Sequence, residues 1–370
     1  MSEWKEYKLG DVAEVKYGKA HQSLADGKIP AYGSGGLMRY VERALYEDES
    51  ILIPRKGTLN NVMYKSEPFW TVDTMFYTRL NKQIIVPKYL FYQLSTIDFA
   101  NMNVGSAVPS MTVPVLNDID INVPPLTEQT AIASVLSSLD DKIDLLHRQN
   151  ATLEKMAETL FRQWFVEEAK EEWEMGKLGD LVESANTGLD AIRRAPIVEN
   201  YTGIKCLRIQ DISQSKPISN WGNSEVTDSD FKKAQLKKGD IIMARTCSPG
   251  ILLHIQEDLP AVFNNGLARI RANKSNCHPL FLKYLFKTDL FINHIYGISD
   301  GTAVQLNMKL GDLLSFDLSI PPKVFLDSFI EIVKKWDDKI LINQTQIRTL
   351  TALRDTLLPK LISGEVKVEL

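Results

Sequence analysis

The feature that most constrains this chain is an internal repeat, because a duplicated unit decides the architecture of the whole molecule. Residues 4–14 read WKEYKLGDVAE and residues 173–183 read WEMGKLGDLVE, with the Leu-Gly-Asp steps 169 residues apart. Further along, LDDKI at residues 139–143 matches WDDKI at residues 336–340, at an offset of 197. The second copy therefore carries an insertion in its globular part.

Each copy has the same internal order. It begins with β-branched runs and turn signals, such as Ser50–Pro54 and Gly239–Ala244, and ends with a long helical pattern after a Pro-Pro pair. We therefore predict globular domains over residues 1–122 and 173–319, and helices within residues 123–172 and 320–370. The expected fold is α+β: two mixed α/β domains separated by two long antiparallel coiled-coil helices, with a pseudo-twofold repeat.

The helical segments carry apolar residues in an unbroken 4-3 spacing, which is the seam of a coiled coil. Neither seam is stable in water, since full burial of each apolar side chain contributes about 1.5–3 kcal/mol. The two helices are therefore expected to pack together. The predicted seam residues are Leu139, Ile143, Leu146, Asn150, Leu153, Ala157 and Leu160 in the first helix, and Trp336, Ile340, Asn343, Ile347 and Leu350 in the second.

The two seam asparagines indicate an antiparallel register. Asn150 is a d-type position and Asn343 an a-type position, and antiparallel seams place these types opposite each other. If the asparagines face each other, contact partners have residue numbers that sum to 493, which puts Ala157 against Trp336 and Leu146 against Ile347. The alternative is that each asparagine meets water or a loop.

Each of the two long helices follows a globular domain at its N-terminal end. If the helices pair antiparallel, they form a rod with one domain expected at each end. About 35–40 residues at a 1.5 Å rise make roughly 50–60 Å, comparable with about 15–17 base pairs. Such a protein matches the symmetry of a DNA duplex.

The charge distribution and the cysteines limit the classes of protein that fit the sequence. The net charge of −4 is concentrated in residues 123–172, which hold ten acidic and five basic residues. The cysteines Cys206, Cys247 and Cys277 show no CxxC spacing, and neither a signal segment nor an uncharged stretch of about 20 residues occurs. We expect a cytoplasmic protein with reduced cysteines.

Taken together, these segments resemble the specificity subunit of type I restriction-modification systems, and the resemblance runs the entire length. Its most specific pieces are the two openings in Trp-x4-Leu-Gly-Asp, Val123–Gln129 (VPPLTEQ), Leu139–Ile143 (LDDKI), Leu160–Phe165 (LFRQWF) and Leu358–Val366 (LPKLISGEV). One departure is visible: Ile320-Pro321-Pro322 lacks the Leu-x-Glu-Gln that follows the prolines of the first copy.

The resemblance implies a DNA-binding subunit that is not an enzyme. Each of two target-recognition domains would read one half of a bipartite asymmetric DNA site. The helices would set the spacing and dock two modification (methyltransferase) subunits, to which restriction (translocase-nuclease) subunits attach. S-adenosylmethionine and ATP would be bound by those partners, and no cofactor by this chain.

Candidate DNA-contact residues follow from the donors and acceptors that base edges and phosphates require. In the first domain they lie in two polar loops after probable strands; an ordinary tight turn is the alternative for the glycines. A simple expectation is that Arg55→Ala or Arg245→Ala weakens specific binding by about 1–3 kcal/mol and relaxes one half-site. The candidates are Gly33, Ser34, Gly35, Arg55, Lys56, Thr58, Asn60 and Asn61 in the first domain, and Arg193, Arg194, Arg208, Gln210, Arg245, Thr246, Ser248, Asn264, Asn265, Thr302 and Gln305 in the second.

Other polar groups are not assigned to catalysis. Asp140, Asp141, Asp337 and Asp338 flank the seam beside lysines and are expected to be solvated or to face a partner subunit. The histidines show no metal-ligand spacing, so no metal is expected.

Two other function classes fit the sequence less well. A fused methyltransferase would need an Asn/Asp-Pro-Pro-Tyr/Phe motif and a glycine-rich cofactor loop, and neither is in the sequence. A coiled-coil protein-interaction scaffold explains the acidic helix but not two divergent domains on one repeated frame.

Overall fold

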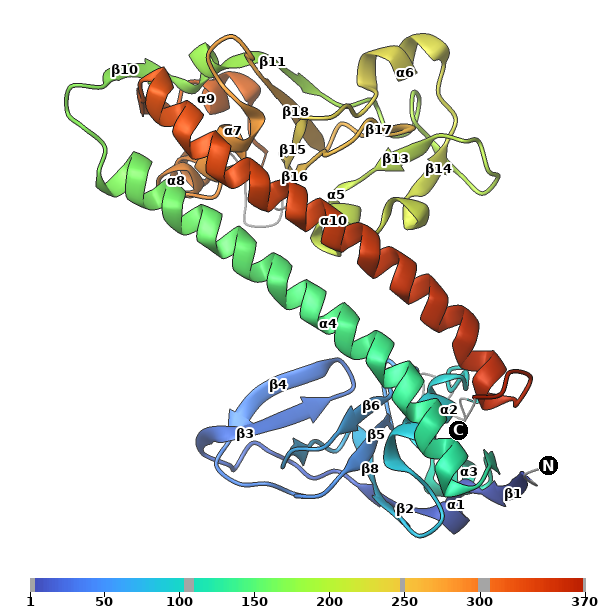
Figure 1. Ribbon diagram of the computed structural model, residues 1–370. Helices are drawn as coiled ribbons and strands as arrows, with labels where there is room; N and C mark the ends of the chain where they lie inside the picture. The colour runs from blue at the N-terminus through green and yellow to red at the C-terminus, as the bar shows by residue number, and fades with distance from the viewer. Residues whose placement is uncertain (1–3, 103–109, 247–249, 299–306, 369–370) are drawn as a thin grey trace. The chain divides into compact units, whose positions relative to one another are not determined.

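The computed structural model describes residues 4–102, 110–246, 250–298 and 307–368. The chain divides into two compact units, residues 1–146 with 345–370, and residues 147–344. Two long helices, α4 (Leu126–Arg162) and α10 (Lys323–Ile362), contribute to both units (Figure 1).

The first unit contains a four-stranded sheet and a three-stranded sheet. The four-stranded sheet has the order β2-β8-β5-β6 and is antiparallel, whereas the three-stranded sheet, β4-β3-β7, pairs β3 and β7 in parallel. Strands β1 and β9 close the domain as an antiparallel pair. The elements are β1 (Lys5–Lys8), α1 (Leu9–Val12), β2 (Ala13–Tyr17), β3 (Asp26–Gly33), β4 (Gly36–Val41), β5 (Ser50–Pro54), β6 (Met63–Lys65), β7 (Trp70–Thr71), β8 (Met75–Leu80), α2 (Pro87–Ser95), α3 (Val113–Asn117) and β9 (Asp120–Val123).

The second unit repeats this plan with additions. Its sheets are β11-β18-β15-β16 and β12-β14-β13-β17, where β13 and β17 are parallel like β3 and β7, and β10 pairs with β19. Strand β12 has no counterpart in the part of the first unit that the structure describes, and it belongs to the longer second copy. The elements are β10 (Glu174–Lys177), η2 (Leu178–Leu181), β11 (Val182–Thr187), β12 (Ile197–Val198), β13 (Lys205–Leu207), α5 (Ile209–Ser213), η3 (Ile218–Asn220), β14 (Gly222–Ser224), α6 (Asp228–Ala234), β15 (Ile241–Ala244), β16 (Leu252–His254), β17 (Ala261–Phe263), β18 (Leu267–Ala272), α7 (Pro279–Leu285), α8 (Asp289–Ile298), α9 (Leu310–Leu314) and β19 (Asp317–Ile320).

The central strands explain how the sequence specifies the larger sheets. Every residue of β5 and of β15 is buried, and each strand has a hydrogen-bonded neighbour on both sides. Continuous apolar runs such as Ile51–Ile53 and Ile241–Met243 are typical of strands that are covered on both faces.

Each long helix begins directly after its Pro-Pro pair, at Leu126 and at Lys323. In the second unit the helices run antiparallel, because Asn150 of α4 contacts Asn343 of α10 while Phe161, further along α4, contacts Phe329, earlier in α10. A π-helical turn, η1 (Gln163–Glu167), ends the first helix.

The twelve seam residues named above are all buried or half-buried. The 4-3 spacing continues beyond these twelve residues, with Leu136 three residues before Leu139 and Val333 three residues before Trp336. Leu136 belongs to the core of the first unit, and Ala157 and Val333 belong to that of the second. Burial of the seam therefore joins each domain to the helices as well as the helices to each other.

Asn343 is fully buried, and its Nδ2 donates a 2.8 Å hydrogen bond to Oδ1 of Asn150. This is the pair that the 493 register predicts. The Nδ2 atom also lies 3.5 Å from Oε1 of Gln149. The asparagines thus meet each other rather than a loop.

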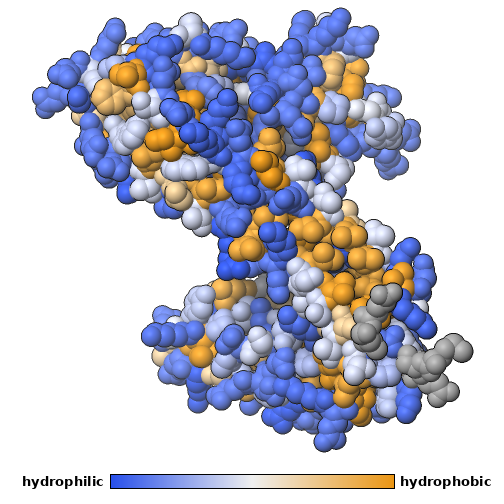
Figure 2. Space-filling model, viewed as in Figure 1, coloured by the Kyte–Doolittle hydropathy of each residue, from blue (hydrophilic) through white to orange (hydrophobic). Residues whose placement is uncertain are grey.

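The outer faces of the helix pair are partly apolar. Figure 2 shows apolar side chains grouped over the paired helices, on a surface that is otherwise mostly hydrophilic. On the helices, the exposed large apolar residues among those described include Leu145, Met156, Ile342 and Leu353. No described helix combines the length and apolarity that crossing a bilayer requires.

Candidate nucleic-acid interface

The two loops predicted in the first domain meet in the structure. Nδ2 of Asn61 donates a 2.8 Å hydrogen bond to the carbonyl of Ser34, which joins the loop after β5 to the turn between β3 and β4. Gly57 has a φ of +86° and faces the Ser34 side chain, so a side chain at this position would be strained. Lys56, Thr58 and the turn residue Gly35 are exposed, whereas Gly33 is buried.

Arg55 leaves the end of β5 and is half-buried. Its amide donates to the carbonyl of Thr74 (2.8 Å) and its Nη1 to the carbonyl of Asp73 (3.0 Å). Its guanidinium carbon lies 5.3 Å from the ring centroid of Tyr17, and its carbonyl accepts from the amide of Met111. The residue is held by its own domain on several sides.

Arg245 has the same position at the end of β15 in the second domain. Its amide donates to the carbonyl of Gly266 (3.0 Å), its Nη1 to that of Asn265 (3.0 Å), and its own carbonyl accepts from the amide of Met308. In addition, Nη2 donates to Oδ1 of Asn307 and Nε to the carbonyl of Met308. Each guanidinium nitrogen of Arg245 therefore has an acceptor within its own domain.

The two arginines thus occupy equivalent places. Each follows the central strand of its sheet, and each donates its amide and its Nη1 to two consecutive carbonyls. Each arginine thereby fixes its own loop to the turn before the next strand of the sheet, β8 or β18, and we call this contact the arginine clamp. The sequence did not indicate this role, because the carbonyls that accept from Nη1 lie 18 and 20 residues away.

Asn60 is also used within the domain. Its Nδ2 donates to Oδ1 of Asp98 (3.0 Å), and its Oδ1 accepts from the amide of Ala100 (3.0 Å). Asn60 and Asn61 were candidates for DNA contacts; in this structure their side-chain amides hold the loop, and contact with a base stays a prediction.

In the second domain, the candidates Asn264 and Asn265 meet the loop after β11. Leu189 forms a β-bridge with Asn264, and the amide of Asn265 donates to the carbonyl of Leu189 (2.8 Å). Nη1 of Arg245 donates to the carbonyl of Asn265, so the loop after β15 also contacts this segment. Thr246 lies beside it and forms a bridge with Asn307.

This loop presents a rigid turn. Oδ1 of Asp190 accepts hydrogen bonds from the amides of Arg193 (2.7 Å) and Ile192 (3.0 Å), which lower the pKa of Asp190. Arg194 is paired with Asp230 of α6. Arg193 is exposed, and it projects from a backbone that is fixed before any ligand arrives.

The remaining candidates of the second domain lie elsewhere or are not described. Arg208 is half-buried and donates Nε to Oδ2 of Asp211 (3.0 Å) at the start of α5, and Gln210 is exposed on the same helix. Ser248, Thr302 and Gln305 lie outside the described residues.

Sequence reasoning also missed exposed apolar residues at these loops. On β4, Leu37, Met38 and Tyr40 are 51%, 56% and 51% exposed. The pairing of β3 with β4 shifts at Met38, as in a β-bulge, which re-aims a side chain. In the second domain, Ile192 is 84% exposed. A single exposed apolar residue such as Ile192 is ordinary, whereas Leu37, Met38 and Tyr40 lie together on one short strand, as the residues of an exposed apolar patch do.

The expectation for the seam-flanking aspartates was wrong for Asp337. This residue is only 8% exposed, and its Oδ1 lies 3.0 Å from Nζ of Lys283. Asp140 is half-buried and pairs with Arg354. Asp141 and Asp338 are exposed, as expected. Local spacing could not reveal the lysine, which lies 54 residues from Asp337.

Among the described residues, no group of three or more His, Cys, Asp or Glu side chains could hold a metal ion. The buried thiols Cys206 and Cys277 are free, and burial raises the pKa of each to about 12. Neither thiol is therefore activated as a nucleophile.

Two similar domains with polar loop surfaces, built on one helix pair, define a binding protein with duplicated modules. A family model described as the type I restriction modification DNA specificity domain matches residues 1–155 and 170–352. The chain therefore belongs to the type I restriction modification DNA specificity family. As a specificity subunit it is the non-catalytic DNA-recognition component, and it works in assembly with modification and restriction subunits.

Individual relatives agree over the full length. The chain is 28% identical over 415 residues to the type I restriction enzyme MjaIX specificity subunit of Methanocaldococcus jannaschii, covering 99% of this chain and 94% of that protein. It is 22% identical over 407 residues to the MjaVIII specificity subunit of the same organism, with the same coverage. The crystal structure of a type I restriction-modification S subunit from M. genitalium superimposes with a TM-score of 0.63 at 16% identity, covering 100% of this chain and 97% of that one, which shows a shared fold.

Proposed function

We propose that residues 1–122 and residues 173–319 each read one half of a bipartite, asymmetric DNA sequence. The observation that carries this proposal is the repeated arginine clamp: the same backbone frame holds Arg55 and Arg245, while the exposed side chains around the two clamps differ. A repeated frame with divergent exposed residues suits two readers of different sequences.

The side chains proposed to reach the DNA are those that the domain leaves exposed. Lys56, Thr58 and Arg193 can donate to phosphates or base edges. The bulged hairpin of β3 and β4 has the form of a two-stranded ribbon, which the major groove admits, and Leu37 and Met38 would contact thymine methyl groups there.

The helix pair is proposed to set the distance between the half-sites and to dock two modification subunits, which in turn carry the restriction subunits. Continuous helices of 37 and 40 residues are suited to fix a distance. A groove lined by Met156, Thr159, Leu160 and Trp336 offers an apolar docking surface on the pair. In this assignment the protein is cytoplasmic, and S-adenosylmethionine and ATP bind to the partners.

A binding experiment with the methyltransferase partner tests the assignment. Genome-wide methylation mapping identifies the target, and mobility shifts are then measured at two salt concentrations on target and scrambled DNA. We expect salt-sensitive retention that is specific for the target. Absence of a shift with every genomic fragment would instead favour the coiled-coil scaffold.

The hairpin contact has its own test. Replacing each thymine of the first half-site by deoxyuridine removes only methyl groups. The affinity of the wild type should fall, and that of Leu37→Ala should respond less, with Lys335→Ala on the exposed face of α10 as the control. Equal losses for all three proteins would remove the hairpin from the interface.

A further inference from the structure

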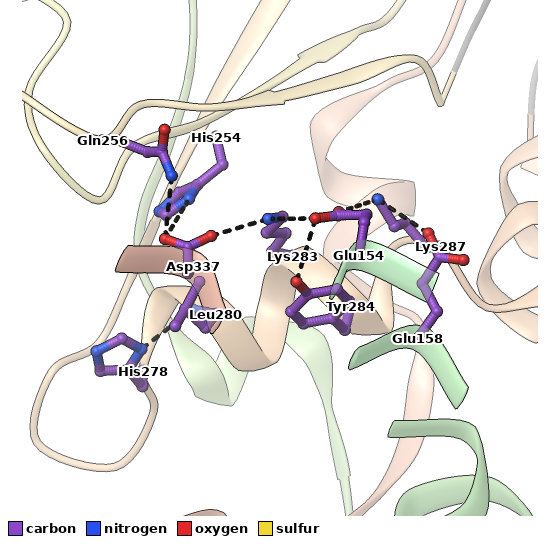
Figure 3. A network of polar contacts seen from close by, with 10 residues as sticks. All are labelled: Glu154, Glu158, His254, Gln256, His278, Leu280, Lys283, Tyr284, Lys287 and Asp337. Atoms are coloured by element: carbon purple, nitrogen blue, oxygen red, sulfur yellow. Dashed lines mark hydrogen bonds and ion pairs between the residues drawn. The ribbon is translucent and has the colours of Figure 1, made fainter. Parts of the chain in front are cut away.

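A network of buried and half-buried charges joins the second domain to both long helices (Figure 3). Lys283 of α7 is 7% exposed, and its Nζ lies 3.0 Å from Oδ1 of Asp337 on α10 and 3.2 Å from Oε2 of Glu154 on α4. A single side chain of the domain therefore bridges the helix pair.

Further contacts surround this lysine. Lys287 is paired with Glu154 and Glu158 of α4, and the hydroxyl of Tyr284 donates to Oε2 of Glu154 (3.4 Å). The second oxygen of Asp337 accepts from Nε2 of Gln256 (3.2 Å), and it lies 3.9 Å from Nδ1 of His254. The network thus ties α7 and the end of β16 to both helices.

The charges in this network depend on one another. Burial alone would raise the pKa of Asp337, but Lys283 and His254 more than offset it, so that this pKa is lowered. Burial also opposes ionisation of Glu154, yet Lys283 and Lys287 lower its pKa. Removing Lys283 would leave the buried carboxylate of Asp337 without its lysine, which is strongly unfavourable.

The ion pairs of this network can determine the orientation of the domain as well as its attachment to the helices. The core of the second unit already packs α7 against the helices through Phe281, Phe329 and Phe161. Apolar burial is non-directional, whereas ion pairs with fixed distances are suited to one arrangement of the elements that they join. The network is therefore suited to select an orientation.

The first unit contains an equivalent contact. Asp140 occupies the position of Asp337 in the repeat, 197 residues earlier. The hydroxyl of Tyr92 on α2 donates to its Oδ2 (2.6 Å), and Nη1 of Arg354 on α10 lies 2.9 Å from its Oδ1. Helices α2 and α7 both begin at a proline and both belong to the globular parts. The same seam-flanking position therefore binds its own domain in both units, through different chemistry.

We propose that Asp140 and Asp337 are positioning residues, each of which fixes the orientation of its recognition domain on the helix pair and thereby the DNA spacing that the protein accepts. The proposal rests on the proposed function. A domain that can rock on the helices would reach half-sites at more than one distance.

The test uses the full chain in complex with its methyltransferase partner, with the mapped target rebuilt at spacer lengths of one base pair fewer, the native length, and one base pair more. Asp337→Asn removes the charge without changing side-chain size, and Asp338→Asn is the matched control on the exposed face of the same helix. We expect Asp337→Asn to reduce the preference for the native spacer by about tenfold, because it weakens the coupling between the two half-site contacts, and Asp338→Asn to leave the preference unchanged.

A milder variant covers the case in which Asp337→Asn fails to fold. Tyr92→Phe keeps the ring and removes only the hydroxyl that donates to Asp140, and it should reduce spacer preference in the same direction. Lys283→Arg retains the cation and should preserve the preference.

The outcomes separate the possibilities. A lower melting temperature with unchanged spacer preference in the folded variants would show a structural role only and overturn the proposal. A wild type that binds no DNA specifically would overturn the proposed function itself, and with it this inference.

Discussion

Arginines at a recognition surface differ in how many of their donors are already used. In Arg245 each guanidinium nitrogen is directed to an acceptor of its own domain, whereas Arg193 is exposed on a turn that Asp190 fixes. The first residue is therefore suited to hold the surface, and the second to contact DNA.

Alanine substitution separates these two roles. Arg245→Ala should lower the free energy of unfolding by about 1–3 kcal/mol, because several hydrogen bonds that each contribute roughly 1 kcal/mol are lost. Arg193→Ala should change it by less than about 0.5 kcal/mol, while weakening binding to the second half-site by about 1–3 kcal/mol. Thermal melting and binding to DNAs altered in one half-site measure both effects; equal melting of the two variants would contradict the assignment.

His254 makes stability depend on pH. Burial lowers its pKa to about 4 from the ordinary value of 6.5, so the folded protein keeps the ring neutral. Below pH 6.5 the unfolded chain binds a proton that the folded chain does not, and folding is disfavoured as the pH falls from 6.5 towards 4. The cost at pH 5 relative to pH 7.5 is about 2 kcal/mol.

The His254→Asn variant should lack this cost. Melting temperatures at pH 7.5 and pH 5 measure it, and the fall should be smaller for the variant than for the wild type. The nearby Asp337 does not contribute in this window, because its lowered pKa acts only below its ordinary value of 3.8. An identical fall in both proteins would show that His254 is protonated in the folded state.

Single residues also show where inference from the sequence stops. The identity of Lys56 and Arg193 as exposed cations could be read from residue type and local turn signals. The internal roles of Asn60 and Asp337 could not, because their partners Asp98 and Lys283 are distant in sequence and meet them only after folding.

At the scale of elements, the paired helices follow closely from the sequence. A 4-3 repeat is a local pattern, and the two asparagines add a register, so the contact between Asn150 and Asn343 could be predicted from the residue pattern alone. The sheets were less accessible: the parallel pairing of β3 with β7 joins segments that no local pattern relates.

The asparagine pair should specify register at a cost in stability. Asn343 is fully buried, and its Oδ1 has no hydrogen-bond partner among the described residues. Replacing both asparagines by leucine removes the buried Oδ1 that lacks a hydrogen bond and adds apolar side chains to the seam. The double variant should therefore be more stable by about 1–3 kcal/mol.

Thermal melting of the Asn150→Leu/Asn343→Leu double variant checks this expectation. Leucines at the exposed positions Thr152 and Gln346 of the same helices provide a control for added apolar surface. A lower melting temperature for the seam variant alone would mean that the asparagine hydrogen bond outweighs the buried, unpaired oxygen.

At the scale of the whole molecule, charge is the quantity that does not fit a protein that binds DNA alone. The chain has a net charge of −4, with 47 acidic against 43 basic residues. Neutralising phosphates supplies most of the sequence-independent affinity for DNA, and each neutralised phosphate adds about 0.9 to the slope of log affinity against log salt.

The assembled complex should therefore depend on salt far more steeply than the isolated chain. If Lys56, Arg193 and a few neighbouring cations neutralise the phosphates, the chain alone should show a slope of about −2 to −4. Binding of the modification subunits should steepen the slope by at least about three, because those subunits would supply most phosphate contacts. Affinities measured between 50 and 200 mM salt, a range over which such contacts change binding by orders of magnitude, give both slopes. Equal slopes would mean that this acidic chain makes the phosphate contacts itself, through a concentration of cations that its composition does not suggest.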